Sequence, residues 1–163
     1  MHGIRNSFTA VFLFGLALAL LLIPQPASSG SPQDTNMPQA GATDAVPAYH
    51  TKAPQGELPE TMNPDLFTDP VVQNAYAVAA KIKKTLYQQP CYCHCDRSQG
   101  HTSLLDCFAS KHGSGCGTCL YEDLYSYEQS RKGKTAAQIR EGIIKGEWKS
   151  LDATKYQKPL SAK

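Results

Sequence analysis

All six cysteines of this 163-residue chain lie between positions 91 and 119. Three of them alternate with other residues in the stretch Pro90-Cys91-Tyr92-Cys93-His94-Cys95, and the remaining three are Cys107, Cys116 and Cys119. Thiol sulfur is a nucleophile, a redox centre and a ligand for soft metal ions. We therefore expect any chemistry of this protein to depend on sulfur and to take place near this segment.

The cysteine spacing excludes several familiar sites. Covalent haem attachment needs C-x-x-C-H, but Cys119 is followed by Leu120, so no haem is predicted. A conventional zinc finger is a poor match, because only Cys116 and Cys119 have the usual spacing of a ligand pair. The spacing typical of bacterial ferredoxins is also absent.

A soft-metal site is the first of three interpretations that remain. Alternate cysteines on an extended or turning segment can direct three thiolates into one small volume, and thiolate-rich sites select Cu(I), Zn(II) or related ions. Histidines inside the motif and beside the second cysteine group can add imidazole nitrogens. The predicted metal ligands are Cys91, Cys93, His94, Cys95, His101, Cys107, His112, Cys116 and Cys119.

Two other interpretations use the same residues. An even number of cysteines in an exported chain is typical of disulfides, and each cysteine of the first group would then pair with one of the second. The product would be a disulfide-stapled interaction module with no chemistry. Alternatively, Cys116 and Cys119 form a C-x-x-C pair at a helix start, where the helix dipole favours a thiolate for redox chemistry. The spacing leaves these alternatives open.

The segment that must position the motif is a helix. Asp69 and Pro70 form a typical helix start, an N-cap followed by proline at the first helical position. Apolar residues then recur every three or four positions, which predicts a helix over residues 70–87. Pro90 stops it, because proline disfavours helical geometry in the preceding residue. The cysteine motif is therefore expected to follow directly from a helix C-terminus.

The rest of the cysteine region also has helical patterns, and no strand pattern competes with them. Residues 96–102 are expected to form a loop. Further helices are predicted over residues 104–110, 116–131 and 136–148, the last after a capping box at Thr135. The sequence thus predicts a mainly α fold, a small three- to four-helix cysteine-cluster domain over residues 69–150.

The flanking regions predict export and flexibility. Residues 1–29 have the layout of a secretory signal peptide, with a positive start, an apolar run and small residues before a possible cleavage. Residues 30–68 are rich in proline and poor in large apolar residues, which predicts a disordered linker. Residues 151–163 are expected to be a flexible tail. The protein is expected in the periplasm, cell envelope or extracellular space, at a membrane only if the signal segment stays uncleaved.

Composition and motifs limit the classes of binding partner and activity that the sequence predicts. Sixteen basic and fourteen acidic residues give a formal net charge of +2, which argues against a nucleic-acid partner. No Ser-His-Asp set or carboxylate pair indicates a hydrolase, so no catalytic residue is predicted. The expected partners are a soft metal ion and another exported metal-binding or redox protein.

The motif and its surroundings resemble a known family. The cysteine segment, with Gly100-His101, Asp106-Cys107-Phe108, His112-Gly113 and Cys116-x-x-Cys119, resembles the exported bacterial proteins named for a PCYCGC or CYCXC motif. The resemblance covers roughly residues 69–148. It implies an exported protein or lipoprotein with a short helical domain, in a family whose function is largely uncharacterised. Some relatives carry selenocysteine within the motif, which implies a reactive or metal-binding position.

This chain departs from the family pattern at two points. His94 stands where the commoner motif has glycine. Because glycine favours a left-handed turn that histidine tolerates less well, the local backbone or the ligand set is expected to differ here. In addition, no cysteine follows the N-terminal apolar run, so the lipid attachment of some relatives is not expected.

Overall fold

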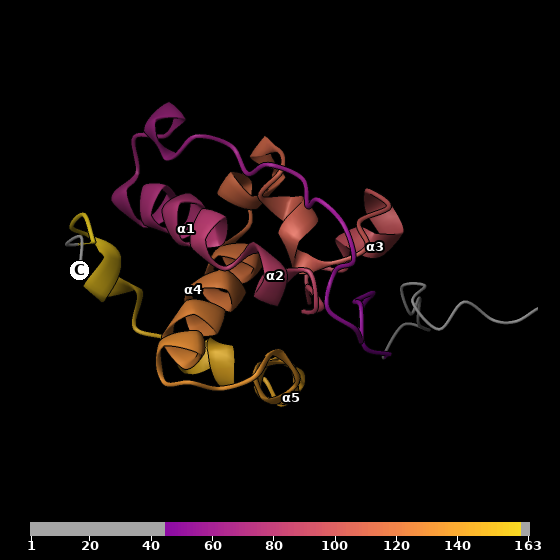
Figure 1. Cartoon of the computed structure of the whole chain (residues 1–163). Helices are drawn as coiled ribbons and strands as arrows, with labels where there is room; N and C mark the ends of the chain where they lie inside the picture. The colour runs from indigo at the N-terminus through magenta and orange to yellow at the C-terminus, as the bar shows by residue number, and fades with distance from the viewer. Residues whose placement is uncertain (1–44, 161–163) are drawn as a thin grey trace, which may run out of the picture. The chain divides into compact units, whose positions relative to one another are not determined.

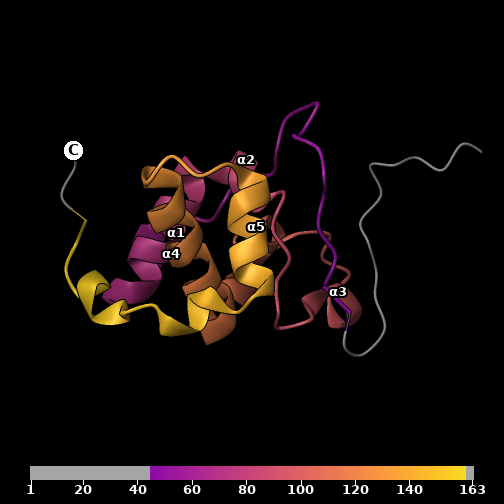
Figure 2. The same ribbon diagram turned by 90° about the horizontal axis from the view of Figure 1, so that it is seen from below.

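The computed structural model describes residues 45–160, and within that range every regular element is helical, so the mainly α fold is confirmed. The predicted signal peptide and the first part of the linker lie outside the described range. Three longer helices lie close together and are joined by shorter ones (Figure 1, Figure 2).

The helical elements are labelled α for α-helices and η for 3-10 helices. In chain order they are η1 (Pro64–Leu66), α1 (Pro70–Lys81), α2 (Lys83–Leu86), α3 (Cys95–Ser98), η2 (Leu104–Cys107), η3 (Lys111–Gly115), α4 (Gly117–Arg131), α5 (Ala136–Ile144), η4 (Glu147–Ser150) and η5 (Ala153–Tyr156). The three longer helices are α1, α4 and α5. None of the described helices combines the length and apolarity that a membrane span requires.

Helix α1 begins as predicted and ends early. The Asp69 carboxylate accepts hydrogen bonds from the backbone N–H groups of the second and third helical residues, and Pro70 occupies the first position. The helix expected over residues 70–87 is divided at Ile82, which adopts φ −118° and ψ 28°. The cysteine motif therefore follows the short helix α2 rather than one long helix.

The main hydrophobic core lies between α1 and α4. Tyr76 of α1 and Phe108, just after η2, are fully buried, and their rings meet edge to face at 5.1 Å. Leu105 and Leu124 are also fully buried, and each such side chain contributes about 2 kcal/mol on leaving water. The same core includes Cys91, Cys95, Cys107 and Cys119. These four thiols are therefore packed within the hydrophobic core.

The shorter elements differ from the sequence predictions in length. The helix expected over residues 104–110 is the single 3-10 turn η2, and the loop expected over residues 96–102 includes part of the one-turn helix α3. The last predicted helix ends at Ile144 instead of near residue 148, because Gly146 adopts a left-handed conformation with φ 76°. Helix α4 has nearly its predicted length.

Helix α5 forms a second, smaller core with α4. Its start has the predicted capping box, in which the Thr135 hydroxyl accepts from the Gln138 N–H and the Gln138 side chain accepts from the Thr135 N–H. Ile139 and Ile143 are fully buried and pack against Tyr125 of α4. This packing supports the face of α4 that lies away from α1 (Figure 2).

The prediction of a disordered linker over residues 30–68 is wrong from residue 45 onward, where the chain packs against the helices. The Met62 N–H donates to the Phe108 carbonyl at 2.9 Å, and the His50 ring stacks on Tyr87 with centroids 3.8 Å apart. The few apolar side chains of this stretch suffice because they add to a core that already exists. The packed domain therefore includes the described residues from 45 onward, well before the expected start at 69.

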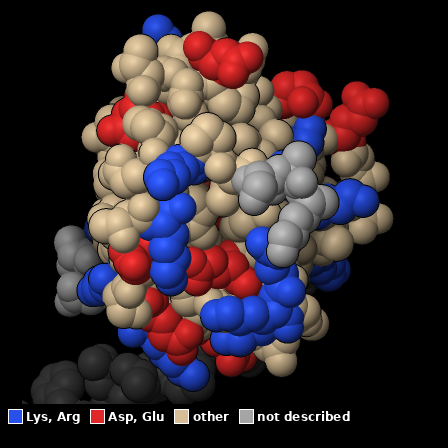
Figure 3. Space-filling view, turned by 90° about the vertical axis from the view of Figure 1, so that its left-hand side faces the viewer, with Lys and Arg blue, Asp and Glu red and all other residues tan. Residues whose placement is uncertain are grey.

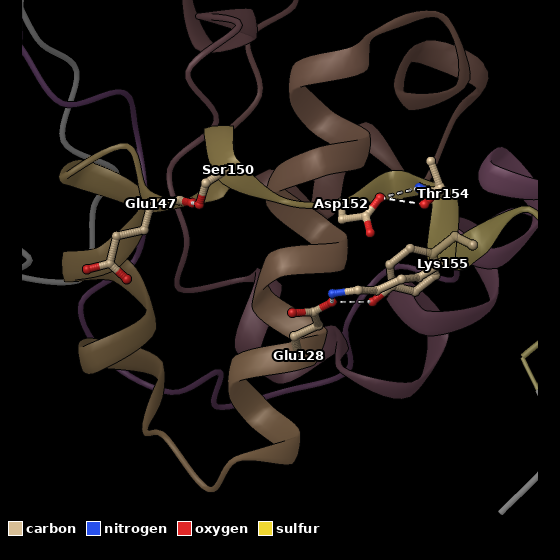
Figure 4. A network of polar contacts seen from close by, with 7 residues as sticks. Glu128, Glu147, Ser150, Asp152, Thr154 and Lys155 are labelled. Carbon is tan, nitrogen blue, oxygen red and sulfur yellow. Dashed lines mark hydrogen bonds and ion pairs between the residues drawn. The ribbon is translucent and has the colours of Figure 1, made fainter.

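The tail predicted over residues 151–163 is also packed as far as it is described. The Asn74 side-chain amide donates to the Tyr156 carbonyl at 2.8 Å, and the buried Tyr156 hydroxyl donates to Glu128 at 3.2 Å. Figure 4 shows Lys155 beside Glu128, 3.9 Å away. The prediction of a flexible tail missed this packing because its contacts come from distant parts of the chain.

Charges of both signs share the face shown in Figure 3. Lysine and arginine side chains lie among aspartate and glutamate side chains there. A surface of one sign, which would attract nucleic acid, is not present on this face. This distribution agrees with the small net charge of +2.

The cysteine motif turns sharply at His94. The His94 N–H donates to the Cys91 carbonyl at 3.0 Å, and His94 has φ 56° and ψ 35°. It is the one non-glycine residue with positive φ among the described residues. The left-handed turn that glycine favours is therefore retained with histidine, at a cost of about 1 kcal/mol or more.

We expect His94→Gly to stabilise the reduced, metal-free protein by about 1 kcal/mol, because glycine adopts this conformation without a Cβ clash. Urea unfolding of the two proteins measures the difference. Gly100→Ala is the matched control, since Gly100 also has positive φ (68°) and open space around its Cβ position. That substitution should destabilise the protein by a similar amount. A His94→Gly protein less stable than the parent would contradict this account of the turn.

Candidate metal centre

Backbone hydrogen bonds fix the cysteine motif between η2 and α4. Just before the motif, the Gln89 carbonyl accepts from the Leu104 N–H at 2.9 Å. Inside it, the Tyr92 N–H donates to both carboxylate oxygens of Glu122, at 3.0 and 3.3 Å. One bond comes from η2 and the other from α4, so the motif is held between the two elements that carry the other clustered cysteines.

Five sulfur atoms converge at this point. The Cys91 sulfur lies 3.3 Å from those of Cys93 and Cys119, and the Cys93 and Cys119 sulfurs are 3.5 Å apart. The Cys95 sulfur lies 3.4 Å from that of Cys107. These contacts are too long for disulfides, whose S–S bonds are about 2.05 Å, and all six cysteines are free thiols.

The ligand atoms form two overlapping sets, each of four atoms within 4.8 Å of one another. The first set is Cys91, Cys93, Cys107 and Cys119. The second set is Cys93, Cys95, Cys107 and His112. Soft metal ions bind such groups of thiolate and imidazole ligands. The cluster can therefore hold a metal ion.

Two histidines stand at the edge of the cluster. The His112 Nε2 lies 3.8 Å from the Cys93 sulfur, and the His101 Nδ1 lies 3.4 Å from the Cys107 sulfur. Their rings meet edge to face at 5.1 Å. Burial lowers the pKa of His101, which favours the neutral imidazole. A neutral ring can ligate a metal ion or donate an N–H to a thiolate.

Close packing of η3 on η2 places His112. Gly113 is buried, and a Cβ there would lie 2.9 Å from the Cys107 carbonyl oxygen. The Tyr76 hydroxyl accepts from the Ser114 N–H at 3.1 Å and donates to the Ser110 carbonyl at 2.6 Å. Only glycine fits at position 113, and the approach it permits brings the neighbouring imidazole to the cluster.

Three predicted ligands, His94, His101 and Cys116, belong to neither four-atom set, although His101 lies beside the Cys107 sulfur. The His94 ring packs edge to face with Tyr92 at 6.0 Å. Cys116 is the half-exposed N-cap residue of α4, whereas Cys119, one turn later, makes thiol contacts within the cluster. The two cysteines of the C-x-x-C sequence therefore lie in different environments, Cys116 at the half-exposed helix start and Cys119 inside the thiol cluster.

Charge in the cluster concentrates on one sulfur. The pKa of Cys93 is lowered because the thiols of Cys107, Cys119 and Cys91 surround its sulfur and stabilise a thiolate. The pKa of Cys107 is raised, because its thiol is engaged with those of Cys119 and Cys91 and is also buried. Cys93 is half-buried, so the first negative charge forms at the most accessible of these four sulfurs.

The chain before α1 also covers part of the cluster. Pro47 and Ala48 are buried and line a small cleft together with Cys91 and Cys95. The Ala48 N–H donates to the Asp96 carboxylate at 3.2 Å. These residues were assigned to the linker from sequence, so their contribution to the site was not anticipated.

Sequence reasoning also missed two carboxyl groups of α4. Glu122 and Asp123 are fully buried. Burial raises the pKa of Glu122 to about 8, although the Tyr92 N–H opposes the shift. Burial also raises the pKa of Asp123 well above its usual range, and neither of its oxygens has a hydrogen-bond partner in the described structure. Glu122 could have been found from its position one helical turn after Cys119, on the same face.

Comparison with known proteins identifies a family. A family model described as "Protein of unknown function with PCYCGC motif" matches residues 49–160. None of the curated proteins and none of the solved structures compared matches the chain. The matched range begins at residue 49, within the segment that precedes α1 and packs against the helices.

We expect the metal-free protein to lose stability as pH rises from about 4.5 to 8, because folded Glu122 keeps its proton over this range while the unfolded chain releases it. Glu122→Gln removes the contribution of Glu122 to this dependence and retains an acceptor for the Tyr92 N–H, while Asp123, whose pKa burial also raises, keeps its own contribution. The variant should match the parent near pH 4.5 and exceed its stability above pH 8 by a few kcal/mol. Urea unfolding across this range measures the difference, with exposed Glu57→Gln as the control. Parallel profiles for parent and Glu122→Gln would contradict the assignment.

Proposed function

Since the chain belongs to the family of proteins of unknown function with a PCYCGC motif, we propose a function from its site: the domain binds a soft metal ion, Cu(I) or Zn(II), through cysteine thiolates. The observation that carries this proposal is the convergence of four cysteine sulfurs, Cys91, Cys93, Cys107 and Cys119, within 4.8 Å of one another.

The sulfur spacing is close to that of a metal site. In a tetrahedral zinc site with Zn–S bonds of about 2.3 Å, neighbouring sulfurs are about 3.8 Å apart. The contacts among Cys91, Cys93 and Cys119 are 3.3 to 3.5 Å. An ion would therefore need sulfur displacements of less than about 1 Å. Such preorganisation favours tight binding, since little of the chain has to be ordered when the ion arrives.

The surroundings of the cluster also support metal binding. Leu104 and Leu105 are fully buried in the same core as the thiols, so the site has few competing water molecules. The His101 ring, 3.4 Å from the Cys107 sulfur, can support a thiolate by hydrogen bonding. Thiols must lose protons to bind, so loading releases protons and strengthens with pH.

We also place this binding outside the cytoplasm. The layout of residues 1–29 supports export, and thiols there need protection from oxidation, which a bound ion provides. The half-buried Cys93 and His112 support exchange of the ion with another exported metal-binding or redox protein, because ligand exchange needs accessible donor atoms.

The two cysteines of the C-x-x-C sequence provide a matched test. We expect the reduced protein to bind Cu(I) or Zn(II), measured by competition with a chromophoric chelator, with protons released into weak buffer. Cys119→Ser should lower the affinity by at least about 100-fold, since it removes a ligand. Cys116→Ser should leave the affinity within a few-fold of the parent, because Cys116 lies outside both ligand sets. Equal losses from both variants would show that Cys116 is also a ligand and would contradict the two ligand sets, and no binding by the parent would refute the proposal.

A further inference from the structure

The cluster has more donor atoms than one soft ion uses. Five thiols and one imidazole belong to the two sets of four ligand atoms. Zinc in protein sites almost always takes four ligands in a tetrahedron. A single zinc ion would therefore leave two of these donors without a role, although they lie within the same few ångströms.

The two sets overlap at two residues, Cys93 and Cys107. Thiolate sulfur has several lone pairs and can bind two metal ions at once. Building on the proposed metal binding, we propose that the domain holds two zinc ions, with the Cys93 and Cys107 thiolates bridging them. The first ion completes its four ligands with Cys91 and Cys119, and the second with Cys95 and His112.

The positions of the outer ligands fit this division. Cys91 and Cys119 lie together, with their sulfurs 3.3 Å apart, and belong only to the first set. Cys95 contacts Cys107 at 3.4 Å, and His112 contacts Cys93 at 3.8 Å. Each of the two outer ligands of the second set therefore lies beside one of the shared cysteines.

The left-handed turn at His94 separates the two sets along the chain. It comes between the bridging Cys93 and Cys95, and the Cys91 carbonyl closes it by accepting from the His94 N–H. Cys91 and Cys95 consequently serve different ions, although both are two residues from Cys93. The alternating C-x-C-x-C spacing thus provides one outer ligand, one bridge and one outer ligand.

The charge balance favours two divalent ions over one ion in the first set. Four thiolates around a single Zn(II) there leave two net negative charges, whereas the five thiolates with two Zn(II) leave one. Four of these cysteines are buried, and uncompensated charge in a protein interior is costly. The second ion also allows every cysteine of the cluster to bind as a thiolate.

Native mass spectrometry of the reduced full chain, loaded with Zn(II) and passed over a weak chelator, tests the stoichiometry. We expect two zinc ions per chain. One ion would overturn the two-ion centre while leaving the proposed metal binding intact, and no ion would overturn both. Cys116→Ser is the control and should retain two ions.

Substitutions separate shared from outer ligands. Cys91→Ser and Cys95→Ser each remove an outer ligand, so each variant should retain one ion after the same treatment. Cys93→Ser should retain none, because both ions lose a ligand. Retention of one ion by Cys93→Ser would show that the two ions do not share this thiolate.

Cadmium provides a test that needs no substitution, which matters if a serine variant fails to fold. Cd(II) replaces Zn(II) in thiolate sites, and the nucleus of 113Cd reports its ligands. The unaltered chain loaded with 113Cd should give two resonances that are coupled to each other through the bridging sulfurs. Two uncoupled resonances would overturn the bridges, and a single resonance from one bound ion would overturn the second site.

Discussion

The hydrophobic core that holds five free thiols within a few ångströms of one another is the feature on which the rest of this domain depends. Thiol groups are weak hydrogen-bond donors, so their mutual contacts cannot hold separate chain segments together. The packing of Tyr76 and Phe108 between α1 and η2 supplies that force, and α4 completes the core. The carboxyl group of Glu122 then fixes the motif from α4 through the Tyr92 N–H. The cluster is thus a product of the core around it.

Buried acidic groups cost the domain free energy when they ionise, and a cation bound beside them would reduce that cost. Glu122 and Asp123 are fully buried, and Glu122 accepts from the cysteine motif, whose thiols can also become anions. Small domains have only about 5–15 kcal/mol of net stability, so such groups stay neutral or require compensation. An ion that binds only the folded chain would add stability by mass action. The proposed metal centre therefore links the stability of this domain to the supply of metal.

The ligands of the cluster differ in exposure. Pro47 and Ala48 cover Cys91 and Cys95, and the Ala48 N–H donates to the Asp96 carboxylate. Cys93 and His112 are half-buried. Bound ions would be shielded from water and oxidants at the covered ligands and exchanged through the half-buried ones. Such an arrangement suits a protein that receives and passes on soft metal ions.

The sequence by itself determined the helical class, the Asp69 helix start, the Thr135 capping box and the importance of the cysteine region, because these features depend on neighbouring residues. It also identified every cysteine and histidine of the two ligand sets, but it included His94, His101 and Cys116 as well, since spacing cannot show where a side chain points. Tertiary structure alone decided which sulfurs meet, that Glu122 supports the motif, and that residues 45–66 belong to the domain. These features depend on contacts between distant segments, which only the packed core brings together.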